Sequence, residues 1–387
     1  MPDGYEIHGK TVRVFFYWEG QFCREPIGPP TEGNKAKAQR LAEIIRYEID
    51  CDTFDYARHF PESPRVLNST FGHYLDLWLT IKKNELAFSS YRGTESKSRV
   101  HIQPRWGQVQ INSIDHLDLQ EWIRNGLEKL HNKTIKEIVS IMRQVFVLYG
   151  TRHKSAFNPT TGITIRLPDQ DDPDPFTLVE IKKILSTPTK RIQELNLMKF
   201  MLWDGPRLSE GMALAWEDVI SVEKGLVRYQ RALVRNRYKV TKTKRSTRVH
   251  TLLKPAREAL QEQYKLTAHL EPIVAEITQR DNRSVKTAKI RPVFRNSQSL
   301  NPHYGDQYIR ERFWSTHLKN ACVRYRGPNQ CRHTFISQML STGVVPLHWI
   351  AQHVGHTSTE MIQKRYGKWI TQDGADMNSI IEGIFKL

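Results

Sequence analysis

The sequence predicts a multidomain α+β protein: a small sheet-plus-helix module, an all-α helical domain, and a mainly helical third domain with a short antiparallel sheet. Residues 11–27 alternate between apolar and polar side chains, which is the period of a β-strand. Residues 69–157 instead carry apolar side chains at helical spacing. Residues 158–175 are rich in Pro, Gly and Asp, a linker composition, so a domain boundary is expected there.

The first expected domain comprises residues 1–64. Every second residue from 12 to 18 is apolar, which leaves Arg13 and Tyr17 on the opposite face of the strand. Glu19 and Gly20 are typical of a turn, and residues 21–27 resemble a returning strand. Asn34 is expected to cap a helix. Its apolar face comprises Ala38, Leu41, Ile45 and Ile49.

The second expected domain comprises residues 65–158 and four helices. One apolar stripe consists of Phe71, Tyr74, Leu75, Trp78 and Leu79. Another follows Asn132 as a cap and consists of Ile135, Ile138, Val139, Met142, Val145 and Phe146. Between them lies a basic segment whose charged side chains form either a solvated face or phosphate contacts: Lys97, Arg99, His101 and Arg105.

Residues 159–173 are the expected linker, and residues 174–387 are the third domain. Thr177 and Glu180 have the spacing of a capping box, which predicts a new helix at the start of this domain.

The composition excludes several classes of protein. Lys and Arg total 58 against 41 acidic residues, a formal charge of +17, which indicates a polyanionic partner such as DNA or RNA. No apolar run is long enough for a membrane span, and residues 1–10 lack the apolar core of a signal peptide, so a cytoplasmic protein is expected. Cysteines 23, 51, 322 and 331 have no paired spacing, which indicates free thiols rather than zinc ligands or disulfides.

Arg207 is the first candidate for phosphate chemistry. It follows a Gly-Pro turn between two helical patterns, where a guanidinium is exposed on a loop yet anchored by apolar helices. The alternative is an ordinary surface arginine. Glu210, one helical turn later, would orient Arg207 or brace the helix.

A basic hairpin is the next candidate. Residues 226–239 are expected to form one strand, and a second strand is expected from Arg248. The turn between them carries Lys242, Lys244 and Arg245, which could reach into a groove and donate a proton, or could simply be solvated.

The stretch from Pro328 to Tyr366 holds the other candidates. It contains Asn-Gln-Cys-Arg332-His333-Thr-Phe, then an apolar helix, then His-Val-Gly-His356, and finally Tyr366. Thr357 and Glu360 have capping-box spacing, so a helix is expected to begin after His356 and to carry Tyr366 near its end. Arg, His and Tyr in a basic chain indicate phosphate chemistry with a tyrosine nucleophile.

These motifs resemble those of the tyrosine recombinases, the phage-type integrases. That family has Gly-Leu-Arg-x-Ser-Glu, His-x-x-Arg-His, Leu-Gly-His and Tyr in this order. Asn329 stands where the family has its first histidine. The three expected domains resemble, in order, an arm-type DNA-binding module, a core-binding domain and a catalytic domain, although the first could instead be a sheet that only packs or dimerises.

The resemblance implies a mechanism. Tyr366 would attack a phosphodiester and form a 3′-phosphotyrosyl link, while Lys242, or else Lys244, protonates the leaving 5′-hydroxyl. Arg207 and Arg332 would hold the non-bridging oxygens. His356 would add a donor or be structural, and His333 is expected to be structural. No cofactor, ATP or metal ion would be required, because the bond energy stays in the phosphotyrosine.

The resemblance also implies partners. The expected substrate is double-stranded DNA carrying core and arm-type attachment sites, bound by a homotetramer and associated with the nucleoid. DNA-bending and excisionase proteins are candidate accessory partners. The expected DNA contacts are Arg13, Lys97, Arg99, Arg105, Lys244, Arg245 and Arg248.

Three rival interpretations stay open on the sequence alone. Asn329 favours a non-catalytic DNA-binding protein on the same scaffold. A metal-dependent nuclease or transposase would need clustered acidic residues, and the run from 169 to 174 lies in the expected linker. A type IB topoisomerase shares the chemistry but needs no arm-type module.

Overall fold

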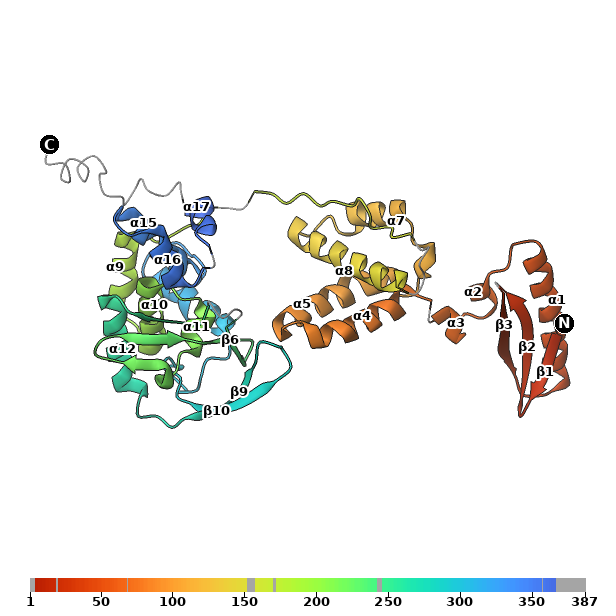
Figure 1. Ribbon diagram of the computed structural model, residues 1–387, viewed down its shortest axis with the longest axis horizontal. Helices are drawn as coiled ribbons and strands as arrows, with labels where there is room; N and C mark the ends of the chain where they lie inside the picture. Colours follow the sequence, from red (N-terminus) through yellow and green to blue (C-terminus); the bar gives the residue numbers. More distant parts are fainter. Residues whose placement is uncertain are drawn as a thin grey trace. The chain divides into compact units, whose positions relative to one another are not determined.

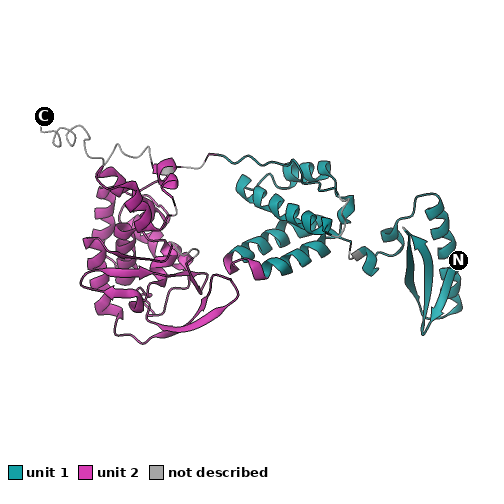
Figure 2. Cartoon of the chain, in the orientation of Figure 1, with its two compact units in different colours: residues 1–83, 90–168 teal, residues 84–89, 169–387 magenta. Residues whose placement is uncertain are grey.

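The structure is a computed structural model that describes residues 4–18, 20–67, 69–151, 157–169, 172–241, 246–356 and 358–366. The chain divides into two compact units, residues 1–83 with 90–168 and residues 84–89 with 169–387 (Figure 2). None of the described helices combines the length and the apolarity that a membrane span requires.

The N-terminal module is an antiparallel three-stranded sheet packed against one long helix (Figure 1). Its elements are β1 (Gly4–His8), β2 (Thr11–Trp18), β3 (Gln21–Gly28), α1 (Glu32–Asp50), α2 (Tyr56–His59) and α3 (Pro64–Leu67). The core alternates as expected, with Val12, Val14 and Phe16 fully buried on one face of β2.

Two details of this module differ from the prediction. Strand β1 was not expected, and it pairs with β2 from Gly4 opposite Phe15 to His8 opposite Thr11. Helix α1 is capped by Thr31 rather than Asn34, because the Thr31 hydroxyl accepts from the Asn34 amide at 3.3 Å. The Asn34 side chain folds back and donates to the Pro29 carbonyl at 2.8 Å.

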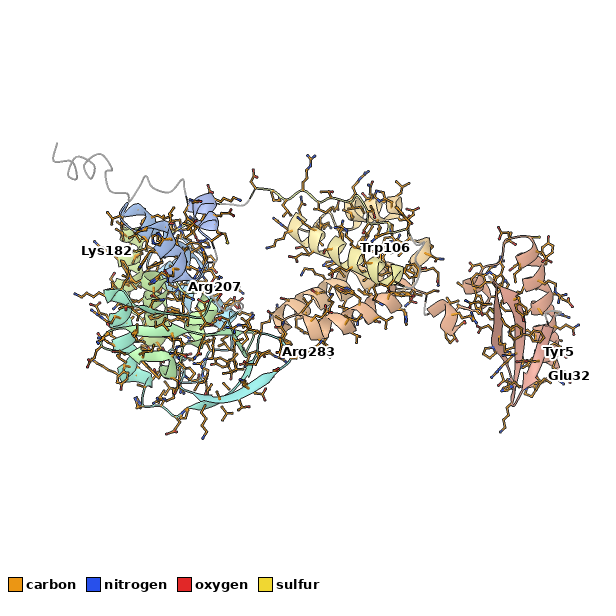
Figure 3. All side chains as sticks on the ribbon, viewed as in Figure 1. Tyr5, Glu32, Trp106, Lys182, Arg207 and Arg283 are labelled. Carbon is orange, nitrogen blue, oxygen red and sulfur yellow. The ribbon has the colours of Figure 1, made fainter. Side chains whose placement is uncertain are left out.

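Residues 69–151, which the structure describes without a gap, form four helical segments, as predicted. The elements are α4 (Phe71–Glu85), α5 (Phe88–Lys97) continuing through a π-helical segment (Ser98–Ile102) into α6 (Gln103–Trp106), α7 (His116–Glu121) with a π-helical turn (Trp122–Gly126), and α8 (Asn132–Gly150). Both predicted apolar stripes are buried, and Trp106, which Figure 3 labels, belongs to the same core.

Two boundaries near α8 require correction. The N-cap of α8 is His131, whose Nδ1 accepts from the Lys133 amide at 3.2 Å, one residue before the predicted Asn132. Residues 159–168, predicted as linker, belong to the same compact unit as the helices. The Arg143 guanidinium donates to the Ile163 carbonyl at 3.0 Å, and Asn132 Nδ2 donates to the Arg166 carbonyl at 2.8 Å. Part of the Pro- and Gly-rich stretch therefore contacts α8, and the boundary between the two compact units falls at residues 168 and 169, inside the predicted linker.

The third part of the chain is mainly helical with two small sheets. Its helices are α9 (Leu178–Ser186), α10 (Ile192–Asp204), α11 (Leu208–Ala213), α12 (Lys254–Thr267), α13 (Asp306–Tyr308) continuing through a π-helical segment (Ile309–Trp314) into α14 (Ser315–Asn320), α15 (Gln330–Ser341), α16 (Leu347–Val354) and α17 (Glu360–Tyr366). Its strands are β4 (Val219–Ser221), β5 (Leu226–Tyr229), β6 (Arg231–Val234), β7 (Arg237–Val240), β8 (Arg248–Thr251), β9 (Ile273–Thr278) and β10 (Val285–Ile290). The capping box of Thr177 and Glu180 at α9 is confirmed.

The sheets are more elaborate than the one short antiparallel sheet expected. One has the order β10-β9-β7-β6, with β7 and β9 parallel, and the other has the order β4-β5-β8. The expected strand at 226–239 is in fact β5, β6 and the start of β7, because Arg235 and Asn236 both take positive φ in a two-residue turn. β6 pairs with β7 and β5 pairs with β8, so β7 and β8, the strands on either side of the expected basic turn, lie in different sheets and do not form the expected hairpin with each other.

Two apolar clusters hold the C-terminal helices in place. The larger core includes α9, α10, α12 and both sheets. A second cluster joins α15, α16 and α17 through Phe335, Ile350, Val354, Ile362 and Tyr366. Because α15 begins beside the end of α10, residues separated by more than 120 positions in the sequence meet there.

Candidate active site

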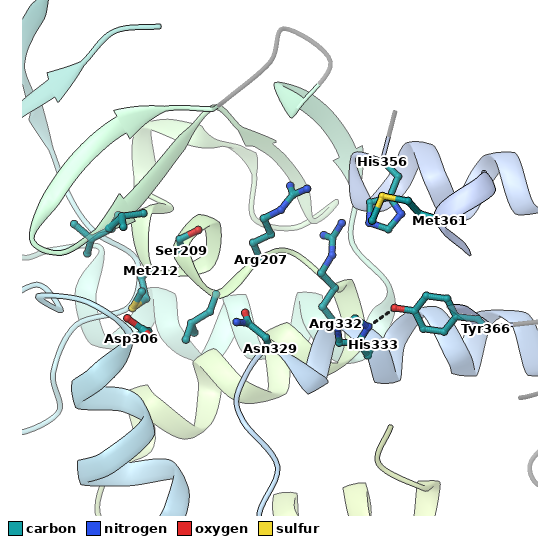
Figure 4. A pocket seen from close by; sticks show the side chains of 13 residues that line it. Arg207, Ser209, Met212, Asp306, Asn329, Arg332, His333, His356, Met361 and Tyr366 are labelled. Atoms are coloured by element: carbon teal, nitrogen blue, oxygen red, sulfur yellow. Dashed lines mark hydrogen bonds between the residues drawn. The ribbon is translucent and has the colours of Figure 1, made fainter. Parts of the chain in front are cut away.

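A cleft of about 460 Å³ brings most of the predicted site residues together (Figure 4). Its lining includes Arg207, Asn329, Arg332, His333, His356 and Tyr366. These residues come from the start of α11, the start of α15, the end of α16 and the end of α17. The sequence motifs, although far apart along the chain, thus define one site.

Arg207 is positioned by a helix-to-helix turn. α10 ends at Gly205, whose φ of 68° is a left-handed conformation, and a Cβ there would lie 2.5 Å from the Phe335 ring. Arg207 then caps α11, and its amide and Nη1 both donate to the Glu210 carboxylate, at 3.1 and 2.9 Å. Its side chain is 45% exposed, so the guanidinium is fixed by Glu210 and still faces the cleft. The Glu210 carboxylate therefore contacts Arg207, which it was expected to orient unless it only braces the helix.

Arg332 is the buried member of the arginine pair. Nη1 donates to the Gly205 carbonyl at 2.8 Å, whereas buried Nη2 has no hydrogen-bond partner among the residues that the structure describes. Burial lowers the pKa of Arg332 to about 9, and the nearby Arg207 cation adds to the shift, so the side chain is charged at pH 7. Figure 4 shows both guanidinium groups extending into the same opening.

His356 follows the glycine that ends α16. Gly355 has a φ of 74°, and a Cβ there would lie 3.0 Å from Arg248 Nη1. Burial lowers the pKa of His356 to about 4, and the Arg332 and Arg207 cations contribute. The imidazole is therefore neutral at pH 7. Its buried Nδ1 lacks a partner within the described part of the chain, which leaves it available to a ligand.

Tyr366 ends α17 with its ring buried and its hydroxyl hydrogen-bonded to His333 Nδ1 (Figure 4). The sequence assigned His333 a structural role, but the structure places it directly on the candidate nucleophile. Asn329, at the N-cap of α15, is exposed and makes no side-chain cap hydrogen bond. Its amide also lines the cleft.

Arg248 is not the surface contact that the sequence predicted. It is 9% exposed, and Nη2 donates to Glu210 Oε2 at 3.1 Å while Nε donates to the His353 carbonyl at 2.7 Å. Burial alone would raise the pKa of Glu210, but Arg248, Arg207 and Arg332 outweigh burial and lower it. One carboxylate among three arginines leaves the site with net positive charge, which suits an anionic phosphodiester.

Four of the other predicted DNA contacts, Arg13, Lys97, Arg99 and Arg105, lie in the N-terminal unit. Lys97 pairs with Glu137 at 3.1 Å and Arg99 pairs with Asp76 at 2.8 Å. Arg105 stacks over the Trp106 ring at 4.2 Å. Arg13 is half-buried on the sheet face opposite the core. DNA contact by these residues stays a prediction.

Several predicted features lie outside the described residues. These are Lys242, Lys244, Arg245 and the Thr357 half of the expected capping box. The described part of helix α17 begins at Glu360, later than the expected start directly after His356, and Tyr366 lies on this helix.

One cluster was missed by the sequence reasoning. Asp204, His250 and His353 place ligand-type atoms within 4.8 Å of one another, the one such group among the residues described. His250 is half-buried on β8 and His353 is buried on α16, and no spacing in the sequence links either of them to Asp204. The Asp204 carboxylate already accepts from both imidazoles and from the Tyr229 hydroxyl.

Comparison with known proteins decides the family. Residues 175–369 match the model described as phage integrase family, residues 70–127 match the phage integrase N-terminal SAM-like domain, and residues 2–64 match an arm DNA-binding domain. The chain is 31% identical over 407 residues to the prophage integrase IntR of Escherichia coli K12, an alignment that covers 98% of this chain and 96% of the relative. The chain belongs to the phage integrase family. It is a site-specific recombinase of the tyrosine type.

Solved structures agree on the fold of this integrase. The Tn1549 transposon integrase in complex with a circular intermediate DNA superposes with a TM-score of 0.64 at 17% identity, covering 82% of this chain and 99% of that one. A lambda integrase dimer bound to a COC′ core site gives 0.59 at 13% identity and covers 94% of each chain. The predicted α+β multidomain fold is thereby confirmed.

Proposed function

We propose that this integrase cleaves and rejoins double-stranded DNA with Tyr366 as nucleophile. The hydroxyl oxygen attacks phosphorus, the bond to the 5′-oxygen breaks, and a 3′-phosphotyrosyl link forms. The 5′-hydroxyl of a partner duplex then attacks this link and releases the tyrosine. Two such exchanges by four protomers would pass through a Holliday junction, and a tetramer on a Holliday junction is what one lambda integrase structure contains.

The observation that carries this proposal is the convergence of donors in one cleft. Arg332 Nη2 and His356 Nδ1 are buried and without partners among the described residues, and Arg207 faces the same space. Preorganised donors of this kind stabilise the charge that develops on the non-bridging oxygens. A nicked suicide duplex tests the proposal: we expect a covalent adduct on a denaturing gel. Tight binding without an adduct would support the non-catalytic alternative.

His333 is the proposed acceptor of the Tyr366 hydroxyl proton. Because its Nδ1 is hydrogen-bonded to the Tyr366 hydroxyl, the neutral ring can accept the proton as the oxygen attacks. The same ring can return the proton when the tyrosine leaves. A proton acceptor is therefore in place although residue 329 is asparagine.

This arrangement predicts how residues 329 and 333 respond to substitution. Asn329→His should change single-turnover cleavage by less than about tenfold, whereas His333→Gln should slow it by roughly 10²- to 10⁴-fold, the usual contribution of general acid–base catalysis. Asn329→Ala should lose more than Asn329→His because the amide donor is removed. The measurement is suicide-substrate cleavage from about pH 6 to 9. A large gain in Asn329→His would show that His333 does not serve this role.

Lys242 is the proposed general acid, with Lys244 as the alternative. Lys242→Ala should slow cleavage of an ordinary duplex by roughly 10²- to 10⁴-fold, because the 5′-alkoxide then leaves without a proton. A substrate with sulfur at the bridging 5′ position should restore the rate, since a thiolate is a good leaving group unprotonated. Lys244→Ala serves as the matched control. The assignment moves to Lys244 if only that variant shows the sulfur rescue.

The N-terminal unit would supply further DNA binding. Residues 65–158 carry 14 Lys and Arg against 8 Asp and Glu, residues 1–64 match an arm DNA-binding domain, and the whole chain has a formal charge of +17. Binding to long attachment-site DNA should therefore fall steeply with salt. Arm-type and core sites, and DNA-bending or excisionase proteins as accessory partners, are part of the same proposal.

A further inference from the structure

A single buried carboxylate lies behind the active-site cleft. Asp204 is fully buried, and its Oδ1 is 2.8 Å from His250 Nε2 and 3.1 Å from His353 Nε2. Its Oδ2 accepts from the Tyr229 hydroxyl at 2.6 Å. Burial alone would raise the pKa of Asp204, but His250 and His353 lower it below its ordinary value. The carboxylate is therefore ionised, and each imidazole nitrogen facing it is a donor.

Asp204 and His353 each lie close in sequence to a residue of the cleft, and His250 lies two residues from buried Arg248. Asp204 ends α10, three residues before Arg207. His353 lies in the last turn of α16, three residues before His356. The end of α10 and the end of α16 therefore meet at this carboxylate. The strand β8, which holds His250 and Arg248, meets them there.

Two series of contacts connect Asp204 to Arg248, and Arg248 is connected to Arg207 in the cleft. The Tyr229 ring, held through its hydroxyl, lies under the Arg248 guanidinium at 4.5 Å. The His353 carbonyl accepts from Arg248 Nε at 2.7 Å. Arg248 in turn donates to Glu210, which accepts from Arg207. A contiguous chain of contacts therefore links the buried carboxylate to a phosphate clamp.

A metal ion is a poor explanation of this cluster. The His250 and His353 rings lie side by side with centroids 4.0 Å apart and planes at 34°. Two imidazoles on one tetrahedral zinc ion diverge from it at nitrogen–metal distances of about 2.0–2.1 Å and do not stack in this way. His353 is also enclosed by Phe335 and Trp349, at 5.1 and 4.7 Å between ring centroids. The site is packed as a hydrogen-bonded core.

We propose that Asp204, His250 and His353 are positioning residues of the recombination reaction, which hold His356 directly, and Arg207 through Arg248 and Glu210, in the geometry that binds the scissile phosphate. This inference rests on the proposed function. The charged carboxylate strengthens both imidazole hydrogen bonds, so its neutralisation loosens three segments at once. Misplacing catalytic groups by about 1 Å can cost about a hundredfold in rate.

The test compares three variants of the full-length protein. Asp204→Asn keeps the shape and one acceptor oxygen but removes the charge. His353→Phe keeps the ring stacked on Phe335 and Trp349 and removes the nitrogen, so it tests the same link if Asp204→Asn fails to fold. Asp218→Asn is the matched control, because Asp218 is 2% exposed in the same domain and bonds Gln230 and Arg231 away from the cleft.

Three quantities are measured for each protein: the dissociation constant for a core duplex, the single-turnover cleavage rate at saturating protein, and the melting temperature. We expect Asp204→Asn and His353→Phe to bind the duplex as the wild type does and to cleave about tenfold to a hundredfold more slowly while folded. Asp218→Asn should lose melting temperature only.

Each contrary outcome has a definite meaning. Folded Asp204→Asn and His353→Phe that cleave at the wild-type rate would overturn the positioning role, as would rates that fall only in proportion to the unfolded fraction. An equal rate loss in Asp218→Asn would show that the loss of any buried carboxylate in this domain slows cleavage. That result would overturn the proposal too. A wild-type protein that forms no adduct would instead overturn the proposed function, before any variant is compared.

Discussion

Tyr366→Phe is expected to bind core DNA as tightly as the wild type and to form no covalent adduct. The substitution removes only the hydroxyl, while the ring stays in the apolar cluster that joins α15, α16 and α17. Without that oxygen no phosphotyrosyl bond can form, so the loss is complete rather than partial. Gel-shift binding and adduct formation on a nicked suicide duplex measure the two properties separately.

Tyr325→Phe is the matched control for this variant. Tyr325 is 48% exposed in the same domain and does not line the cleft, so its removal should change neither property. An adduct that persists in Tyr366→Phe and disappears in Tyr325→Phe would move the nucleophile to Tyr325.

Arg207→Ala should slow cleavage by roughly 10³- to 10⁵-fold, the range seen when an arginine that stabilises a phosphoryl transition state is removed. The fold should survive, because Arg207 is half-exposed and Glu210 keeps its ion pair with buried Arg248. Binding should weaken far less than the rate, since the guanidinium contacts one phosphate among many. Single-turnover rates at saturating protein separate the two effects.

Arg324→Ala removes the same charge from the same domain and serves as the comparison. Arg324 is 66% exposed, pairs with Asp174 and lies outside the cleft lining. We expect it to cleave normally. A comparable loss in both variants would mean that overall charge, not the clamp, sets the rate.

The features that the sequence predicted correctly are those that depend on interactions between residues close together in the chain. The capping box at Thr177, the turn before Arg207 and the pairing of Glu210 with that arginine all involve residues within four positions of one another. The buried stripe of α8 follows equally from helical periodicity. In each case the deciding interaction lies inside the pattern itself.

The predictions that failed depend on distant partners or on competing local signals. Arg248 looks like a surface base, yet Glu210, 38 residues away, and Tyr229 bury it. Helix α1 begins at Glu32, so Thr31 and not Asn34 occupies its N-cap position. The expected strand at 226–239 includes Asn236. Asparagine tolerates the positive φ of a two-residue turn, and the structure has such a turn at this residue.

The Asp204 cluster shows why the site could be only partly predicted. His250 and His353 lie 46 and 149 residues from Asp204, and no spacing rule links them. The contact between His333 and Tyr366 likewise depends on how α17 packs on α15. Sequence motifs predicted the residues that are proposed to touch phosphate, whereas the residues that hold them could be found only from the fold.

The polarity and position of the covalent bond test the central claim most directly. The wild-type protein is trapped on a suicide duplex in the presence of a metal chelator, digested with protease, and the DNA-linked peptide is identified by mass spectrometry. We predict one peptide, joined through Tyr366 to a 3′-phosphate, and a released strand whose free 5′-hydroxyl is labelled directly by polynucleotide kinase. A link through another residue, a 5′-phosphotyrosyl bond, or an adduct that forms only when a divalent metal is supplied would contradict it.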